Sequence, residues 1–438
     1  MPRVYLDFNA TTPVEPAVVQ ALLPYLGGQF GNASSSYPLG QQAKQAVAAA
    51  RAQVASMLGA HAPEEVVFLS GGTESINYAL KGAAMAARRS SGRTHLITSC
   101  VEHVAVLETC KWLQTQGFEV TYLPVDHYGC VRVQDVLDAL TPQTMLVSIM
   151  LANNEVGSLQ PVADISRAVQ RYAQQDEDSR LPILVHTDAS QAVGKVRVKV
   201  DELGVDLLTV AGHKLYAPKG VGALYIRTGT EVDTLIHGAS QENGRRGGTE
   251  NVALDVALGQ ACELAEKNLH EYAVTMQESK MFLLEQIQKH CSLSNVGYQV
   301  NGHPEQTLPN TLSISFENIS ATRLLDRESL SLCIVFLPHN LQRLTSSLQC
   351  DQTVIEADGV YASAGSACHS HKHDNNDSKK KNPEDQEENV TVSHVLAAMH
   401  VPREFARGTL RLSVGRSSTQ EELLHAANSI HKAIQQLV

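Results

Sequence analysis

The sequence predicts an α/β protein: a large domain with a mostly parallel seven-stranded sheet, joined to a smaller α+β domain. Two observations support this prediction. Between about residues 41 and 253, short apolar runs alternate with stretches of helical periodicity, which is typical of a parallel sheet covered by helices on both faces. The chain has 438 residues, which is too long for one ordinary domain and long enough for two.

The expected elements follow in chain order, beginning with a strand-like run at 4–7. Seven runs are expected to form the main sheet: 66–69, 94–98, 120–123, 146–149, 183–185, 207–210 and 223–226. A long helical stretch from about 251 to 290 leads into the smaller domain, which ends in a helix at about 419–438. We therefore expect a large domain and a smaller one with these ranges: 15–255 for the first, and 1–14 with 256–438 for the second.

One segment differs in composition from the rest of the chain. Residues 371–389 contain no apolar side chain and carry charges of both signs, which is typical of a solvated loop. We expect this loop to extend over 368–392 in the smaller domain. His369, His371 and His373 alternate along it, but no cysteine or carboxylate framework fixes them, so we predict no metal site.

Charge and composition exclude several classes of protein. The formal net charge of −11 offers no broad basic surface for nucleic acid, so a small polar substrate is expected instead. No apolar stretch reaches the roughly 18 to 20 residues that span a bilayer. Eight cysteines without a CxxC pair indicate a reducing compartment, and the early strand-like run leaves no room for a targeting peptide. We therefore expect a cytosolic protein that binds no membrane.

Two residues at the ends of apolar runs point to a cofactor. The run 205–211 leads through Gly212 and His213 to Lys214, and a lysine beside a buried strand is costly unless it has a function. An earlier run ends in Asp188. Pyridoxal 5'-phosphate (PLP) requires a lysine amine for a Schiff base and a carboxylate that keeps its ring nitrogen protonated. Taken alone, such a pair is more often a surface lysine and a helix-capping aspartate.

Further run ends carry polar residues that suit the same cofactor. Gly72 and Thr73 open a helix after the run 66–69 and form a seat for an anion such as phosphate. His103 is suited to stack on a pyridine ring and carry protons, and Asn154 to hydrogen-bond a ring hydroxyl. Each residue alone would be a turn or helix-cap residue. Together they predict one site, because ligands of open α/β sheets bind at the carboxyl ends of the strands.

These motifs resemble the cysteine desulfurase and selenocysteine lyase family, whose members are class V aminotransferase-like PLP enzymes of fold type I. The resemblance covers nearly the whole chain and is carried by five segments: 5–13, 70–75, 153–155, 186–188 and 212–214. It implies the fold type I architecture, PLP as cofactor, an amino-acid substrate and an obligate homodimer.

The resemblance also implies a role for each position. Lys214 would form the Schiff base, Asp188 would pair with the ring nitrogen, and His103 would stack on the ring. Two amides would contact the ring hydroxyl: Asn154 and Gln191. Four residues would hold the phosphate, the last of them reaching it from the partner subunit: Gly72, Thr73, His213 and Thr249. One departure is Ala211, where many relatives carry a serine on the phosphate, so one phosphate hydrogen bond is in question.

Cys368 indicates the reaction. It lies among small residues directly before the polar segment, so we expect an exposed thiol beside His369 that can ionise and react. It matches the family's nucleophile, and the expected catalytic residues are thus Lys214, Cys368 and His103. Arg411 matches the arginine that binds the substrate carboxylate, and Arg416 is the weaker candidate.

The expected reaction removes selenium or sulfur from L-selenocysteine or L-cysteine and leaves L-alanine. Selenocysteine lyase is the first interpretation, favoured by Cys-His-Ser at the nucleophile, the run 149–155 and the lack of a targeting extension. A cysteine desulfurase that supplies sulfur for iron–sulfur clusters or tRNA thiolation is the alternative. Another PLP aminotransferase and a non-enzymatic protein of the same fold remain further alternatives. The acceptor of sulfur or selenium, and any partner of the polar loop, are left open.

Overall fold

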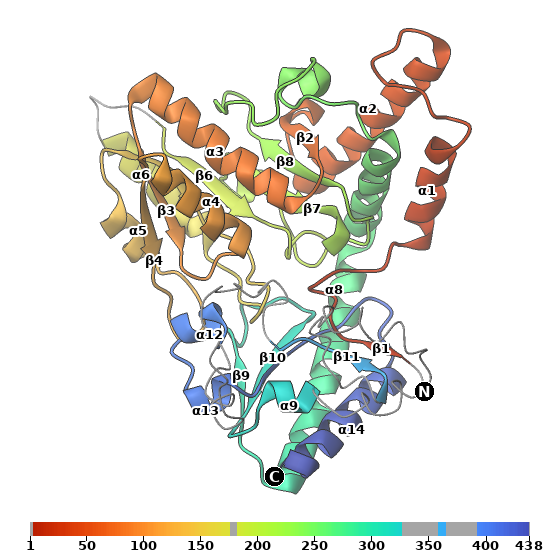
Figure 1. Ribbon diagram of the computed structural model, residues 1–438, viewed down its shortest axis with the longest axis vertical. Helices are drawn as coiled ribbons and strands as arrows, with labels where there is room; N and C mark the ends of the chain where they lie inside the picture. Colours follow the sequence, from red (N-terminus) through yellow and green to blue (C-terminus); the bar gives the residue numbers. More distant parts are fainter. Residues whose placement is uncertain (1–2, 176–181, 326–357, 365–391, 438) are drawn as a thin grey trace, which may run out of the picture. The chain divides into compact units, whose positions relative to one another are not determined.

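The chain folds into two compact units, described here from a computed structural model (Figure 1) that covers residues 3–175, 182–325, 358–364 and 392–437. The larger unit consists of Asn9–Val274 and Gly302–Pro309, and the smaller of Met1–Phe8, Thr275–Asn301 and Asn310–Val438. The sequence-based ranges placed the divisions at 14/15 and 255/256 instead. The difference at the second division arises because the first turns of helix α8 pack in the core of the larger unit.

A seven-stranded sheet in the order β2-β8-β7-β6-β5-β3-β4 forms the centre of the larger unit. Its strands are β2 (Val66–Leu69), β3 (His95–Ser99), β4 (Glu119–Leu123), β5 (Thr144–Ser148), β6 (Leu184–Asp188), β7 (Leu207–Ala211) and β8 (Gly222–Ile226). Only β8 runs against the common direction of the described strands of this sheet. The prediction of a mostly parallel seven-stranded α/β sheet is confirmed, and each predicted run overlaps one of its strands.

Helices cover both faces of this sheet because its strands are apolar on both sides. Val67 and Leu96 share one core with α3 and α4, whereas Phe68 and Leu208 share the other with α2, α6 and the start of α8 (Figure 1). Neighbouring residues of one strand thus face opposite cores. The helices of this unit are α1 (Pro16–Leu26), α2 (Pro38–Leu58), α3 (Gly72–Ser91), α4 (Val104–Thr115), α5 (Val133–Ala139), α6 (Val162–Gln175), α7 (Val200–Leu203) and the first part of α8 (Val252–Ser294), with 3-10 turns η1 (Pro63–Glu65), η2 (Gly212–Lys214) and η3 (Gln241–Gly244).

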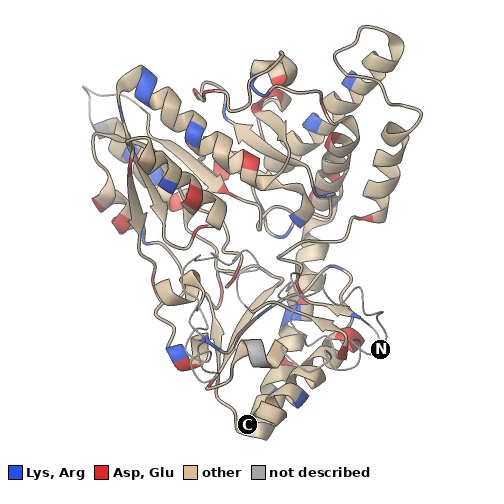
Figure 2. Ribbon diagram, in the orientation of Figure 1, with Lys and Arg blue, Asp and Glu red and all other residues tan. Residues whose placement is uncertain are grey.

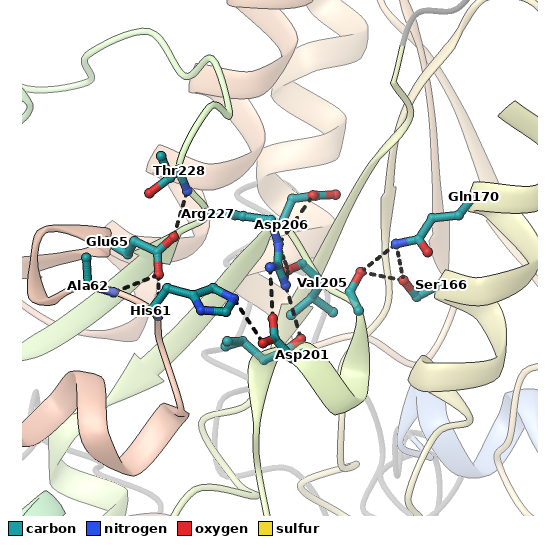
Figure 3. A network of polar contacts seen from close by, with 12 residues as sticks. His61, Ala62, Glu65, Ser166, Gln170, Asp201, Val205, Asp206, Arg227 and Thr228 are labelled. Carbon is teal, nitrogen blue, oxygen red and sulfur yellow. Dashed lines mark hydrogen bonds and ion pairs between the residues drawn. The ribbon is translucent and has the colours of Figure 1, made fainter. Parts of the chain in front are cut away.

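A polar network ties together the edge of the sheet at which β6 and β7 begin (Figure 3). Arg227, directly after β8, donates from Nη2 to the carbonyl of Val205 at 2.9 Å and from Nη1 to the carboxylate of Asp201 at 2.9 Å. Asp206, directly before β7, accepts from the backbone amide of Val185 at 2.8 Å. These contacts hold the starts of β6 and β7 beside the end of β8.

The smaller unit has an α+β architecture. An antiparallel sheet of order β12-β10-β9 and a parallel pair β1-β11 form its strands. The strands are β1 (Val4–Tyr5), β9 (Tyr298–Asn301), β10 (Thr311–Phe316), β11 (Val360–Tyr361) and β12 (Thr409–Ser413); the helices are the rest of α8, α9 (Ala321–Leu325), α12 (His394–Ala398), α13 (Arg403–Ala406) and α14 (Gln420–Leu437). Buried side chains of β10 and β12, such as Ile314, Phe316 and Leu410, contribute to its core.

Charged residues of both signs are interspersed along the helices and loops of each unit (Figure 2). The net charge of −11 is therefore a small difference between 35 basic and 46 acidic residues. Within the described ranges, none of the helices is long and apolar enough to cross a membrane.

Candidate active site

Several predicted site residues stand at the carboxyl-terminal edge of the large sheet. Strands β3 and β5 are neighbours in this sheet. Strand β4 lies beyond β3 on one side, and β6 and β7 lie beyond β5 on the other, so the strand order reverses between β3 and β5. Ligands of open α/β sheets bind at such a reversal. His103 follows β3 and Asn154 follows β5, on either side of it.

Lys214 is the last residue of η2, which directly follows β7. All five residues of β7 are buried, and the strand brings the lysine to the sheet edge, where its side chain is half-buried. The Nζ atom donates to the backbone carbonyls of Asn9 and Ala10, the second at 2.7 Å. The lysine therefore does not extend into solvent, and its amine is oriented by main-chain oxygens.

Residues 9–12, which we call the N-terminal collar, are fastened to this edge of the sheet. Thr12 donates from Oγ1 to the carbonyl of His213 at 3.0 Å, and Asn9 donates from Nδ2 to the carbonyl of Asn154 at 3.1 Å. No role was assigned to the collar from the sequence. In the sequence, these residues stood out only because they belong to the motif 5–13, one of the five segments that carry the family resemblance.

Asp188 is the last residue of β6 and pairs in register with Thr209 of β7. Its Oδ1 accepts from the backbone amide of Ser190 at 2.9 Å. The carboxylate and the lysine thus come from adjacent parallel strands, at the edge where both strands end. This is the juxtaposition that the sequence predicted.

A second carboxyl group, Glu102, is buried in the loop before His103. Its Oε1 accepts from Ser99 Oγ at 2.8 Å and from the backbone amide of Met150 at 2.9 Å. Burial raises the pKa of Glu102 to about 8, and the charge of Asp188 acts in the same direction. Glu102 is therefore neutral at neutral pH and joins the loops after β3 and β5. Sequence reasoning missed it, since a glutamate in a loop is ordinarily exposed.

His103 caps the amino terminus of α4. Its Nδ1 accepts from the backbone amide of Ala105 at 3.2 Å. An imidazole nitrogen that accepts a hydrogen bond carries no proton, so in the neutral ring the proton resides on Nε2. The neighbouring loop is fixed to this one by Asn153, whose Nδ2 donates to the carbonyl of Val101 at 3.1 Å.

The start of α3 forms the expected seat for an anion. A Cβ atom on Gly72 would lie only 3.2 Å from Ala211 Cβ and 3.3 Å from Ser190 Oγ, so glycine keeps the approach to the helix amides open. Thr73 is exposed in the first turn. Ser190 was not singled out from the sequence. Its hydroxyl lies near Gly72, as does Ala211, the position where many relatives carry a serine.

His213 and Gln191 line the same edge. His213 Nδ1 lies 3.2 Å from Thr11 Oγ1. Burial, helped by the charges of Lys214 and other nearby cations, lowers the pKa of His213 to about 4, so it is neutral at neutral pH. Gln191 donates from Nε2 to the carbonyl of Asn9 at 3.0 Å.

Comparisons with known proteins place the chain in a family. The aminotransferase class-V family matches residues 4–328. The chain belongs to this family. It is 41% identical over 434 residues to the cysteine desulfurase IscS of Methanosarcina thermophila, across 99% of this chain and 92% of that one. It is 39% identical over 435 residues to the cysteine desulfurase IscS of Dictyoglomus turgidum, across 99% and 95% of the two chains.

Solved structures agree with this membership. A NifS-like protein matches along 100% of both chains with a TM-score of 0.79 and 34% identity. The structure of SspA in complex with cysteine matches 95% of this chain and 100% of that one, with a TM-score of 0.70 and 32% identity. The fold type I architecture and the family predicted from the sequence are confirmed. A particular closeness to selenocysteine lyase is not, and the alternative activity fits these relatives better.

The cofactor of this class-V aminotransferase family member is PLP, as predicted. The side chains of the larger unit suit it chemically: an amine for its aldehyde at Lys214, a carboxylate for its ring nitrogen at Asp188, and a glycine-opened helix start for its phosphate at Gly72. When bound, PLP supplies an electron sink for the charge that develops at the substrate Cα.

The remaining predicted residues belong to the smaller unit, to an exposed segment of the larger unit, or to parts of the chain outside the described ranges. Arg411 is in β12 of the smaller unit, 2% exposed, and its Nη2 donates to Asp7 Oδ1 at 2.7 Å. Thr249 is exposed in the segment after η3. Cys368 and His369 lie outside the described residues, as does nearly all of the predicted loop 368–392.

Proposed function

We propose that this chain is a cysteine desulfurase that converts L-cysteine to L-alanine and transfers the sulfur to Cys368. The placement of Lys214 and Asp188 at the ends of adjacent strands, beside the anion seat at Gly72, is the observation that carries the proposal. The activity is supported by relatives that are cysteine desulfurases and by a structural neighbour solved with cysteine.

The transfer balances without a further oxidant or reductant. The bond between Cβ and sulfur of the substrate breaks, and a bond forms between that sulfur and Sγ of Cys368. The thiol proton of Cys368 ends, by way of protein groups, on the methyl group of alanine. The product on the protein is a persulfide, which suits a protein that hands sulfur to an acceptor protein.

Residues of the larger unit would divide the work on the amino acid. Lys214, held by the N-terminal collar, would hold the cofactor and then move the proton of the substrate Cα. His103, with its proton on Nε2, would stack on the ring and act as a second proton carrier. Asn154 and Gln191 would contact the ring oxygen, and Gly72, Thr73 and His213 would hold the phosphate.

A homodimer belongs to the same proposal, with Thr249 reaching the phosphate of the partner subunit. It is supported by large apolar side chains that are exposed on the single chain around α1 and the start of α2: Leu23, Leu26, Phe30 and Tyr37. Light scattering should give twice the mass of the 47.4 kDa chain. The cytosolic location remains part of the proposal.

The activity is tested by measuring alanine and protein-bound persulfide after incubating the PLP-loaded protein with L-cysteine. We expect both products, and we expect Cys368→Ala to lose the persulfide while Cys350→Ala, at another position outside the described residues, retains it. Parallel assays with L-selenocysteine separate the alternatives. Alanine from L-selenocysteine alone would contradict the proposal and favour selenocysteine lyase.

A further inference from the structure

Lys195 is a buried lysine with no role in the proposed mechanism. It is only 3% exposed and lies in the turn that follows β6. Burying an ammonium group is costly unless the charge is compensated or used. Its Nζ donates to Gln191 Oε1 at 2.9 Å, and both side chains are buried.

The backbone makes this contact specific. Hydrogen bonds from Val193 N to Ala189 O and from Val196 N to Ala192 O, each 3.0 Å long, wind the segment into successive helical turns. Residues four apart in such a segment lie on the same face. The side chains of residues 191 and 195 are therefore held together by the chain itself.

The ammonium group fixes the orientation of the Gln191 amide. An ammonium has three donors and no acceptor, so it can bind only the oxygen of the amide. The amide nitrogen must then face the other way, and it donates to the carbonyl of Asn9 at 3.0 Å. Without Lys195, the amide can rotate and present its oxygen on that side instead.

This carbonyl also links Gln191 to the reactive amine. Asn9 O accepts from Lys214 Nζ as well as from Gln191 Nε2. Lys195, Gln191, Asn9 and Lys214 thus form one continuous set of hydrogen bonds, and all four residues belong to the larger unit.

Other charged and titratable groups surround this set. His213 lies next to Lys214, and its lowered pKa reflects burial first and then the nearby cations Lys214, Lys219, His103 and Lys195. Asp188 ends the strand that precedes the turn of Gln191 and Lys195, and the neutral Glu102 lies in the loop after β3. Lys195 therefore adds a fixed positive charge to an edge that already carries Lys214, which favours deprotonation of neighbouring groups.

We propose that Lys195 is a positioning residue for PLP. It holds Gln191 with its amide N–H group toward the ring oxygen of the cofactor, and its charge favours the deprotonated form of the linkage between Lys214 and the cofactor. This inference rests on the roles proposed above for Lys214 and Gln191.

The test is a pH titration of the visible absorption of the PLP-loaded protein, with the dissociation constant of PLP measured alongside. In Lys195→Met the protonated form should persist to higher pH, with the midpoint raised by about 0.5 to 1 unit, and PLP should bind about 3- to 10-fold more weakly. Because Lys195 acts on the ring oxygen through Gln191, the loss of PLP affinity in Lys195→Met and Gln191→Met together should be no greater than in the stronger single variant.

A matched control is Lys199→Met, which removes a lysine whose Nζ donates to Ser56 O at 2.9 Å and Met57 O at 3.0 Å, away from this hydrogen-bonded set. This variant should change the unfolding temperature, but it should change neither the pH midpoint of the visible absorption nor the dissociation constant of PLP. Lys195→Gln, which removes the charge but retains an N–H donor, should also raise the midpoint, and serves if Lys195→Met does not fold. Unchanged midpoint and affinity in the Lys195 variants, or affinity losses that add in the double variant, would overturn the inference. A different result would show that the roles proposed for Lys214 and Gln191 are wrong: Lys214→Ala or Gln191→Met would then leave the absorption spectrum of the cofactor unchanged.

Discussion

Glu102 retains its proton at neutral pH because it lies in the protein interior beside Asp188. Burial raises its pKa from 4.5 to about 8. A carboxyl group whose pKa is raised in the folded state stabilises the fold fully below its unfolded pKa, and this contribution is lost as the pH rises through the folded pKa. The relevant window is therefore pH 4.5 to 8.

The variant Glu102→Gln tests this charge state. The glutamine is a neutral polar group at every pH, so the variant does not lose stability as the pH rises. The unfolding free energy of the variant minus that of the unmodified protein should therefore increase by about 2 to 4 kcal/mol between pH 4.5 and pH 8. Urea unfolding at both pH values measures the difference. A difference that does not vary with pH would show that Glu102 is charged in the folded protein.

Asp7 and Arg411 form an ion pair in the smaller unit, 2.7 Å apart, in which the arginine is buried and the aspartate is partly buried. Removing the carboxylate takes away an opposite charge from a buried guanidinium. In Asp7→Asn we expect the unfolding free energy to fall by about 3 kcal/mol. If Arg411 binds the substrate carboxylate, the KM for L-cysteine should also rise about tenfold, with a smaller change in kcat, because the guanidinium loses its orientation. Steady-state alanine formation measures KM and kcat. An unchanged KM would contradict the role of Arg411 in binding the substrate carboxylate.

Single residues differ in how far the sequence reveals them. Lys214 and Asp188 were predicted because each ends an apolar run, where a charged residue conflicts with its surroundings. Glu102 and Lys195 were not, because nothing in a loop sequence shows that tertiary packing will bury it. The partner of Arg411 was also missed, since Asp7 lies at the opposite end of the chain and is brought to it only by folding.

Among the elements, the strands β6, β7 and β8 depend on the network around Arg227 at the edge of the sheet remote from the candidate site (Figure 3). We expect Arg227→Met to lower the unfolding free energy by about 2 to 3 kcal/mol, because the buried carbonyl of Val205 loses a charged donor and Asp206 loses an opposite charge 3.9 Å away. The visible absorption of bound PLP should not change.

The control for this variant is Arg197→Met. Arg197 pairs with Glu202 on the surface, with side chains 65% and 56% exposed, so its removal should cost less than about 0.5 kcal/mol. Equal losses in the two variants, measured by urea unfolding, would contradict a structural role for the network.

The seven strands of the main sheet were predictable because each is an apolar run between helical stretches. Their order and the reversed direction of β8 were not, since pairing is decided by contacts between distant segments. The expected run at 4–7 contains strand β1, but its partner β11 was not predicted, because a strand of two residues carries too little pattern to be assigned from sequence.

At the scale of the whole molecule, two units were predictable from length and from the change in pattern after about residue 251. The boundary between the two units was harder to predict, because α8 is one uninterrupted helix of 43 residues. The boundary falls within this helix and is decided by the residues that pack against each part of it. The residues proposed to hold the cofactor belong to the larger unit. Cys368 and Arg411, which would act on the substrate, come from segments of the smaller one.

The central claim is that Lys214 carries the cofactor. Reduction of the PLP-loaded protein with borohydride, followed by mass analysis of its peptides, measures this directly. We predict a phosphopyridoxyl group on Lys214 and none on the nearby Lys195. A label on Lys195 or another lysine, or no label at all, would contradict the account.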